Sequence, residues 1–164
     1  MKKRYFLQTG AAAVGVILLS RSGILGAEAE TASGEGFEIT KTEAEWREIL
    51  TPSQFNVLRQ RGTELPFSSP LAEQYAPGTY NCAGCDLPLF SSNTKFNSGT
   101  GWPSFYAPLE NAVRTSEDYS LFMTRIEVHC RRCGGHLGHV FDDGPAPTGK
   151  RYCMNGIALQ FISG

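Results

Sequence analysis

Five cysteines are spread unevenly along this chain of 164 residues. Four of them form two Cys-x-x-Cys pairs, Cys82/Cys85 and Cys130/Cys133, and the fifth, Cys153, stands alone in the segment GKRYCMNG (149–156). A thiolate is both a soft metal ligand and a strong nucleophile. The pattern therefore points to two chemistries, a metal site built from four thiolates and a single reactive thiol.

The two pairs have the spacing of a structural zinc site. Each pair puts two thiolates on a tight turn, with Gly84 inside the first turn and Gly134 and Gly135 after the second. Two such turns complete a tetrahedral shell that leaves no open position for a substrate. The neighbouring Arg131 and Arg132 are expected to offset part of the negative charge of the thiolates.

Two other arrangements of these cysteines stay open from the sequence. In an exported protein each Cys-x-x-Cys pair can close a disulfide, although so small a loop adds little stability. A rival metal site uses the segment CRRCGGHLGH, whose candidate ligands are Cys130, Cys133, His136 and His139. That site leaves the first Cys-x-x-Cys pair unexplained.

The neighbours of Cys153 suit a reactive thiol. Alternate residues of a strand share a face, so Arg151, Cys153 and Asn155 are expected to point the same way. A cation favours the thiolate, and the Asn155 amide can donate a hydrogen bond to a developing oxygen anion. The strand is expected to continue into the core through Ile157, Leu159 and Phe161. An inert buried cysteine is the alternative, and the charged and amide neighbours argue against it.

Two further segments are candidate partners of the thiol. GGHLGHVF (134–141) contains His136 and His139, and the following FDDGPAPTGK (141–150) predicts a hairpin that brings His139 beside Cys153. In SGTGWPSF (98–105), glycines around Trp102 predict a rigid loop that presents the indole to a small apolar group such as a methyl. A core tryptophan is the alternative for Trp102.

The elements that must hold these residues differ between the two parts of the chain. TEAE (42–45) and TPSQ (51–54) have the capping-box spacing and predict two short helices, and FSSPLAEQY (67–75) predicts one further turn. The expected buried contacts of the helices are Leu50, Phe55 and Leu58. From residue 78 onward, glycine and proline separate the short runs GTYNC, LPLF, YSLFMTRIEVHC, GHVF and KRYCMNGIALQFI. These runs predict antiparallel sheet structure with the helices at its N-terminal side.

The first 29 residues have the layout of a secretory signal. A basic start (Lys2, Lys3, Arg4) precedes an apolar run (10–19) and a small-x-small exit (27–29). The segment KRYFLQ (3–8) also resembles a twin-arginine export signal, with Lys3 in place of the first arginine. The prediction is a signal peptide over 1–29, a linker over 30–40, one domain over 41–164, and export, most simply to the periplasm.

The composition excludes one class of partner. With 15 basic and 16 acidic side chains, the chain lacks the basic excess of a nucleic-acid-binding protein. Its 41% of hydrophobic residues and its length allow one domain with a real core, for which a monomer is the expected state.

Taken together, the two Cys-x-x-Cys pairs with GTGWPSF, GGHLGHVF, DGP, TG and RYCMN resemble the methionine-R-sulfoxide reductases, over about residues 42–162. The resemblance implies a mainly β fold of two antiparallel sheets with short N-terminal helices, stabilised by a structural zinc on the four paired cysteines. It implies that the Cys153 thiolate attacks the sulfur of methionine R-sulfoxide in oxidised proteins and becomes a sulfenic acid. It further assigns proton donation to His139 or His136, pocket ordering to Asn155 and Arg151, and substrate contact to Trp102 and Phe141.

One departure from the family pattern affects the expected chemistry. Many members have a second cysteine where this chain has Thr100, and that cysteine resolves the sulfenic acid as a disulfide. The chain therefore resembles the one-cysteine form, which needs an external reductant that is thioredoxin-like, glutaredoxin-like or a small thiol. The expected role is repair of oxidised exported proteins. The alternative is a zinc-stabilised binding module without catalysis, with the Trp102 loop as its docking surface.

Overall fold

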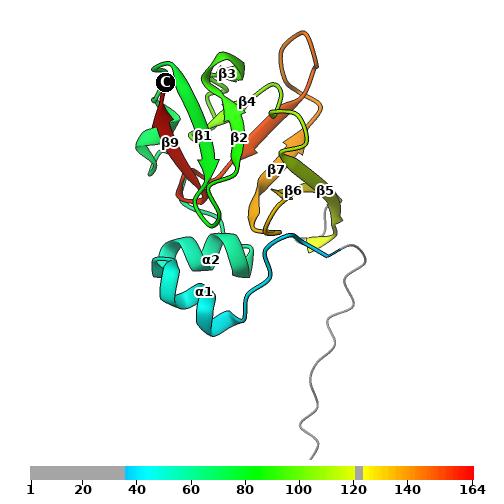
Figure 1. Cartoon of the computed structure of the whole chain (residues 1–164). Helices are drawn as coiled ribbons and strands as arrows, with labels where there is room; N and C mark the ends of the chain where they lie inside the picture. Colours follow the sequence, from blue (N-terminus) through cyan, green and yellow to red (C-terminus); the bar gives the residue numbers. More distant parts are fainter. Residues whose placement is uncertain (1–35, 121–123) are drawn as a thin grey trace, which may run out of the picture. The chain divides into compact units, whose positions relative to one another are not determined.

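The part of the chain described by the computed structural model, residues 36–120 and 124–164, is mainly β with two short helices at its N-terminal side (Figure 1). The predicted signal peptide and the first part of the predicted linker lie outside these residues. Within the described residues, no helix is both long and apolar enough to cross a membrane.

Both predicted helices are present and begin at their capping boxes. They are α1 (Glu43–Ile49) and α2 (Pro52–Gln60). In each, the side chain of the N-cap threonine accepts the backbone N–H of the residue three positions later, and the side chain of that residue accepts the N–H of the threonine. The helix α2 ends at Arg61, whose φ of 57° is left-handed. The expected contacts Leu50, Phe55 and Leu58 are buried. A short 3-10 turn, η1 (Pro70–Ala72), follows the helices.

The strands form two antiparallel sheets, which confirms the predicted fold class. The first sheet has the order β2-β1-β9 and the second the order β3-β4-β8-β7-β6-β5. Their bounds are β1 (Gly78–Cys82), β2 (Pro88–Ser91), β3 (Lys95–Phe96), β4 (Ser104–Phe105), β5 (Val113–Asp118), β6 (Arg125–Cys130), β7 (His136–Phe141), β8 (Arg151–Met154) and β9 (Leu159–Ser163). A 3-10 turn, η2 (Ser92–Thr94), joins β2 to β3.

An aromatic cluster forms the core. Phe90 and Phe105 stack with their ring centroids 4.4 Å apart, and Tyr80 meets Phe105 edge-on at 4.9 Å. All three side chains are fully buried. Because Tyr80 and Phe90 come from the three-stranded sheet and Phe105 from the six-stranded sheet, the cluster holds the two sheets together.

The predicted continuous strand over 150–162 is wrong. The chain leaves β8 at Met154, makes a 3-10 turn, η4 (Gly156–Ala158), and enters β9 in the other sheet. Leu159 and Phe161 therefore do not continue the face of Cys153, although Leu159 is buried in the core. A turn is required here because β8 and β9 belong to different sheets.

Residues 36–40 contact the domain. The Phe37 ring meets the His129 ring edge-on at 5.7 Å, and the Ile39 N–H donates to the Arg132 carbonyl oxygen at 3.0 Å. This part of the predicted linker thus packs on the turn between β6 and β7.

Candidate active site and metal centre

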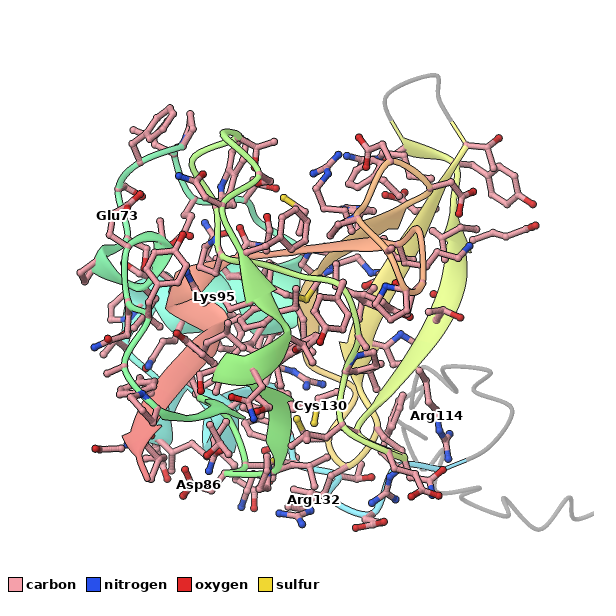
Figure 2. All side chains as sticks on the ribbon, turned by 90° about the horizontal axis from the view of Figure 1, so that it is seen from above. Glu73, Asp86, Lys95, Arg114, Cys130 and Arg132 are labelled. Carbon is pink, nitrogen blue, oxygen red and sulfur yellow. The ribbon has the colours of Figure 1, made fainter. Side chains whose placement is uncertain are left out.

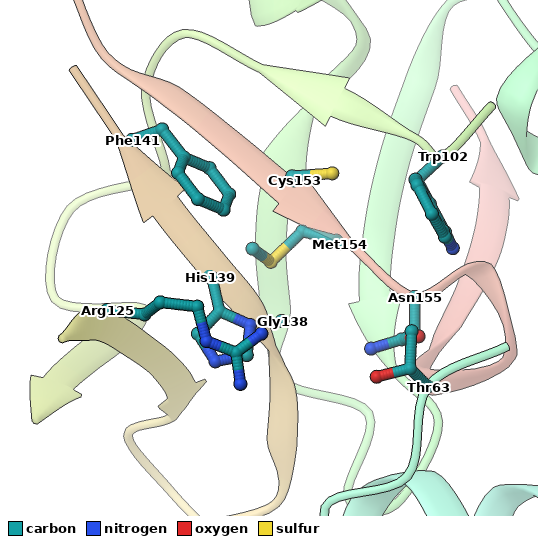
Figure 3. Close-up of a pocket in the computed structure, with 9 residues that line it drawn as sticks. All are labelled: Thr63, Trp102, Arg125, Gly138, His139, Phe141, Cys153, Met154 and Asn155. Carbon is teal, nitrogen blue, oxygen red and sulfur yellow. The ribbon is translucent and has the colours of Figure 1, made fainter. Parts of the chain in front are cut away.

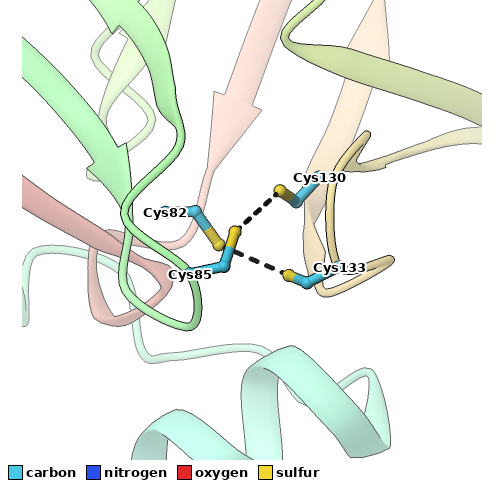
Figure 4. Close-up of side chains that lie close together, drawn as sticks. All are labelled: Cys82, Cys85, Cys130 and Cys133. Atoms are coloured by element: carbon cyan, nitrogen blue, oxygen red, sulfur yellow. Dashed lines mark hydrogen bonds between the residues drawn. The ribbon is translucent and has the colours of Figure 1, made fainter. Parts of the chain in front are cut away.

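The four paired cysteines meet in one cluster (Figure 4). Their sulfur atoms all lie within 4.8 Å of one another, with Cys82 Sγ 3.7 Å from Cys133 Sγ and Cys85 Sγ 3.5 Å from Cys130 Sγ. A zinc ion bound at about 2.3 Å by four thiolates needs sulfurs roughly 3.8 Å apart. The cluster therefore fits a tetrahedral ion of this size.

Each half of the cluster is a tight turn at the end of a strand. After β1, the N–H groups of Cys85 and Asp86 donate to the Cys82 carbonyl oxygen at 3.3 and 2.9 Å. After β6, the Gly134 N–H donates to the Cys130 carbonyl oxygen at 2.9 Å, with Gly134 at a φ of +68° that favours glycine. Because β1 and β6 lie in different sheets, an ion in the cluster joins the two sheets.

The other cysteine arrangements are not those of the structure. All five cysteines are free thiols, and the closest sulfur contacts join one turn to the other rather than the two members of a pair. The rival ligands His136 and His139 bind carboxylates instead, at Glu127 and Asp118. The structure therefore favours the predicted cluster of four cysteines over the two alternatives, the pair of disulfides and the Cys-Cys-His-His site.

Arginines surround the cluster, partly as predicted. Arg132 Nη1 donates to the Cys85 carbonyl oxygen at 3.1 Å, whereas Arg131 binds Glu38 and the Asn111 carbonyl. Figure 2 shows Arg132 and Asp86 at the same end of the molecule as the Cys130 sulfur. The sequence did not indicate Arg59, which donates to the Cys133 carbonyl oxygen at 3.0 Å.

Cys153 lies in a separate pocket of about 220 Å³. Four other predicted site residues line the same pocket, Trp102, His139, Phe141 and Asn155. Figure 3 shows the Cys153 sulfur pointing towards Trp102, with His139 on the β7 side. Trp102 is therefore a pocket residue, and the core tryptophan of the domain is Trp46, which is 2% exposed.

The β7-β8 hairpin pairs His139 directly with Cys153, as predicted. Residues opposite each other on neighbouring strands share a face, so the imidazole and the thiol are both directed to the pocket side of the sheet. The close approach of the strands explains Gly138, where a Cβ atom would lie 2.1 Å from the Cys153 carbonyl oxygen.

A carboxylate orients His139. The Nε2 atom of His139 lies 2.8 Å from Asp118 Oδ2, which also accepts from Arg125 Nη2 at 2.7 Å. The Ser120 N–H and side chain, and then His139, hold the pKa of Asp118 well below its usual range. Since Asp118 is ionised, Nε2 carries the hydrogen and the other ring nitrogen, Nδ1, is free to accept a proton.

Burial lowers the pKa of His139, and Asp118 opposes this shift without cancelling it. The imidazole is therefore neutral at neutral pH. In this state the ring can take up a proton and pass it on, which is the behaviour of a general acid–base group.

A β-bulge puts His136 on the same face as His139. Residues three apart normally point to opposite faces of a strand, but β7 pairs His136 with His129 and Gly138 with Val128, so Leu137 is an extra residue. The two imidazole rings lie 5.4 Å apart. His136 is 3% exposed, and its Nδ1 lies 2.8 Å from Glu127 Oε1, so it packs behind His139.

Arg151 lowers the pKa of the Cys153 thiol, but by less than burial raises it. Its guanidinium lies 4.4 Å from the centre of the Phe141 ring and makes two hydrogen bonds of 2.8 Å to Asp143. Burial raises the pKa of the Cys153 thiol, and the opposing effects of Thr100 and Arg151 are smaller. Cys153 is thus a protonated thiol in the resting protein, with Arg151 limiting the cost of ionisation.

Glu64 supports two sides of the pocket and was missed by the sequence reasoning. Its N–H donates to Asn155 Oδ1 at 3.0 Å, and its carbonyl oxygen accepts from the Trp102 indole at 3.1 Å. Its carboxylate, in a side chain 7% exposed, accepts the N–H groups of Gly156 and Ile157 at the start of η4. No local pattern marks such a residue, because all of its partners are distant in the chain.

Asn155 is held on both sides. Besides the Glu64 contact, its Nδ2 donates to the Leu137 carbonyl oxygen at 3.0 Å. One amide hydrogen remains for a group in the pocket. Asn155 thus joins β7 to the Glu64 segment and also lines the space next to Cys153.

Comparison with known proteins agrees with this site. Residues 50–163 match the SelR domain family. The chain is 60% identical over 124 residues to the peptide methionine sulfoxide reductase MsrB of Methanosarcina barkeri, over 75% of this chain and 87% of that protein. It is 55% identical over 125 residues to the protein of the same name from Pseudomonas putida, over 76% of this chain and 94% of that protein.

Proposed function

The chain belongs to the SelR family and is a peptide methionine-R-sulfoxide reductase, and we propose that Cys153 is its nucleophile and His139 its proton carrier. The observation that carries this proposal is the pairing of His139 opposite Cys153 in one pocket. The alternative of a binding module without catalysis leaves that pairing without a role.

The reaction needs one proton and one pair of electrons. The Cys153 proton passes to the free Nδ1 of His139, and the sulfur lone pair attacks the sulfoxide sulfur. The imidazolium then gives the proton to the sulfoxide oxygen. As the sulfur–oxygen bond of the substrate breaks, the hydroxyl is transferred to Cys153, which becomes a sulfenic acid, and methionine leaves.

The pocket fits a methionine sulfoxide side chain. Its volume of about 220 Å³ suits one small group, and the aromatic rings of Trp102 and Phe141 offer apolar surface to a methyl. The Trp102 ring is held by its bond to the Glu64 carbonyl oxygen. The remaining amide hydrogen of Asn155 is available to the polar end of the substrate.

The oxidised Cys153 is returned to the thiol by an external reductant. Thr100 Oγ1 lies 3.8 Å from Cys153 Sγ, in the position where a second thiol would be needed, and the other four cysteines are gathered in the metal cluster. One external thiol displaces the hydroxyl as water and forms a mixed disulfide. A second external thiol then attacks the mixed disulfide. The two external thiols leave as a disulfide, and Cys153 is again a thiol.

We assign the metal cluster to a structural zinc ion. Cys82, Cys85, Cys130 and Cys133 would hold it with all four positions filled, so when bound it supplies stability rather than Lewis-acid chemistry. Because Cys130 and Cys133 lie on the turn that leads into β7, the strand of His139, a bound ion would help to fix the start of that strand.

The enzyme is proposed to repair oxidised proteins outside the cytoplasm. The support for export is the layout of residues 1–29, which lie outside the described residues. Fractionation of cells that express the full chain, with and without these residues, tests the idea. Export that survives loss of the twin-arginine translocase would reject that route.

A stereochemical assay tests the central assignment. The wild-type protein is expected to reduce the R epimer of a methionine sulfoxide peptide and to leave the S epimer. Cys153→Ser is expected to abolish turnover and to keep its zinc. Turnover near the wild-type level in that variant would remove Cys153 from the mechanism.

A further inference from the structure

Three hydroxyl groups form a chain that ends on Cys153. Thr100 Oγ1 lies 3.8 Å from Cys153 Sγ, and Ser98 Oγ lies 2.8 Å from Thr100 Oγ1. Ser98 Oγ is also 2.7 Å from Ser104 Oγ, which is 3.1 Å from the Trp102 carbonyl oxygen. Ser104 is 1% exposed, and Ser98 and Thr100 are half-buried, so water has limited access to these bonds.

The carbonyl at the far end sets the direction of the chain. A carbonyl oxygen can only accept, so Ser104 gives its one hydrogen to Trp102. Ser98 must then donate to Ser104, and Thr100 must donate to Ser98. Thr100 is left with only lone pairs facing Cys153, so the thiol has to be the donor in that contact.

The whole chain can also run the other way. If Cys153 is ionised, Thr100 can donate to the thiolate, Ser98 to Thr100 and Ser104 to Ser98. The bond lost is the one from Ser104 to the Trp102 carbonyl. The Thr100 N–H, 3.4 Å from Ser98 Oγ, is compatible with both directions because Ser98 accepts it in each case.

We propose that Ser98, Thr100 and Ser104 are positioning residues that hold the proton on Cys153 in the resting enzyme, and that reversal of their hydrogen bonds stabilises the thiolate during the reaction. This inference rests on the proposed function in one respect, that Cys153 is the nucleophile. It assigns Thr100 a role beyond replacing a resolving cysteine. A protonated thiol is also slow to react with other electrophiles before substrate arrives.

The charged and titratable groups around the thiol are left in place by the test. They are Arg151 on β8, His139 on β7 and Arg125 on β6, all at the edge of the same pocket or next to it. Ser104 is unsuitable for substitution because it lies directly opposite Cys153 on β4 and its side chain also bonds the thiol directly. Ser98 and Thr100 are the informative pair, since Thr100 contacts Cys153 and Ser98 acts on the thiol only through the other two hydroxyls.

The experiment measures the rate of Cys153 alkylation by iodoacetamide against pH, in the zinc-loaded full chain. Cys153→Ser provides the background from the other cysteines. Ser98→Ala frees the Thr100 hydrogen for the thiolate. The midpoint pH of the alkylation profile is therefore expected to fall by about half to one pH unit. Thr100→Val removes the donor, so its midpoint is expected to rise, while Thr100→Ser keeps the hydroxyl and the wild-type midpoint.

Opposite shifts from two adjacent hydroxyls are the signature of a directed chain. A rise in Ser98→Ala, shifts of the same sign in both variants, or no shift in either would overturn the inference. If Thr100→Val loses its zinc and fails to fold, the inference depends on the Ser98→Ala variant alone, whose alkylation midpoint must then fall. The measurement does not depend on turnover, so it is distinguishable from failure of the proposed function, which Cys153→Ser reports.

Discussion

His139 on β7 lies directly opposite Cys153 on β8, so the imidazole and the thiol share one face of the six-stranded sheet. Asp118 on β5 holds the ring from the other side through a bond of 2.8 Å to Nε2. An imidazole, a thiol and a carboxylate that fixes the ring are thus brought together by three strands.

Removal of the imidazole should slow the chemical step. His139→Gln is expected to lower kcat by about 10² to 10⁴, the usual contribution of a general acid–base group, because the sulfoxide oxygen loses its proton donor. His129→Gln is the matched control, since His129 packs against Phe37 outside the pocket. Steady-state kinetics of both variants check this, and a His139→Gln enzyme within tenfold of wild type would remove His139 as the proton carrier.

Asp118→Asn should move the pH dependence to lower pH. Asp118 raises the pKa of His139 against the larger effect of burial, so its removal leaves the pKa of the ring lower still. Because His139 must be neutral to take up the Cys153 proton, the limb on which kcat rises with pH follows the pKa of the ring and is expected to shift to lower pH. A profile of kcat against pH measures the shift, and NMR titration of the ring identifies its source.

Asp142→Asn is the control for this experiment, because Asp142 is exposed and pairs with Lys150. Its profile should match the wild type. An unchanged profile in Asp118→Asn, or a shift to higher pH, would mean that Asp118 does not act on the ring as described.

Local signals in the sequence were sufficient for several elements. Both capping boxes, the two Cys-x-x-Cys turns and the β7-β8 hairpin depend on residues close together in the chain, and all were found in the structure. The strand β5 was not predicted, because its sequence VRTSED has no run of apolar residues. Asp118, which ends β5, was missed with it.

The remaining misses depend on contacts between distant segments. The bulge at Leu137 and the turn η4 have no local marker that distinguishes them from regular strand. Glu64 looks like a surface acid, and only its partners in η4 explain its burial. The fold class and the pairing of Cys153 with His139 could therefore be predicted from the sequence, whereas the groups that orient the site could not.

Glu64→Gln should weaken the fold around the pocket. The carboxylate accepts two N–H groups, and an amide would turn its own N–H towards one of them. The expected loss is about 1–3 kcal/mol of unfolding free energy, measured by urea denaturation. Because the same segment holds Trp102 and Asn155, KM should rise as well. Glu48→Gln, on the exposed side of α1, is expected to change neither value.

The stability contribution of Glu64 should also depend on pH. Burial raises its pKa, and the bonds from Gly156 and Ile157 lower it by less. The folded protein therefore holds this proton more tightly than the unfolded chain does. The part of its contribution that depends on protonation is complete below the ordinary glutamate pKa and is lost as the pH rises through the raised value, while the two N–H bonds remain. The free energy of unfolding of the wild type relative to Glu64→Gln should therefore decrease as the pH rises through this range. A difference that does not depend on pH would contradict the assignment.

Loss of one cysteine from the cluster should release the metal and unfold the domain. Zinc binding by four thiolates contributes on the order of 10 kcal/mol to folding, comparable with the whole stability of a small domain. Cys133→Ser is therefore expected to contain no zinc and to unfold well below the wild-type midpoint, whereas Cys153→Ser keeps both. Metal analysis and thermal unfolding check this. Retention of zinc and of the wild-type midpoint in Cys133→Ser would show that the cluster is not the metal site.

The most direct test of the mechanism is a single turnover without reductant. Wild-type enzyme is mixed with excess methionine R-sulfoxide peptide, treated with dimedone, and mapped by mass spectrometry. We predict one equivalent of methionine per enzyme and a dimedone adduct on Cys153, with the four clustered cysteines unmodified. A disulfide between Cys153 and any other cysteine of the chain, or an unmodified Cys153 after methionine has formed, would contradict the account.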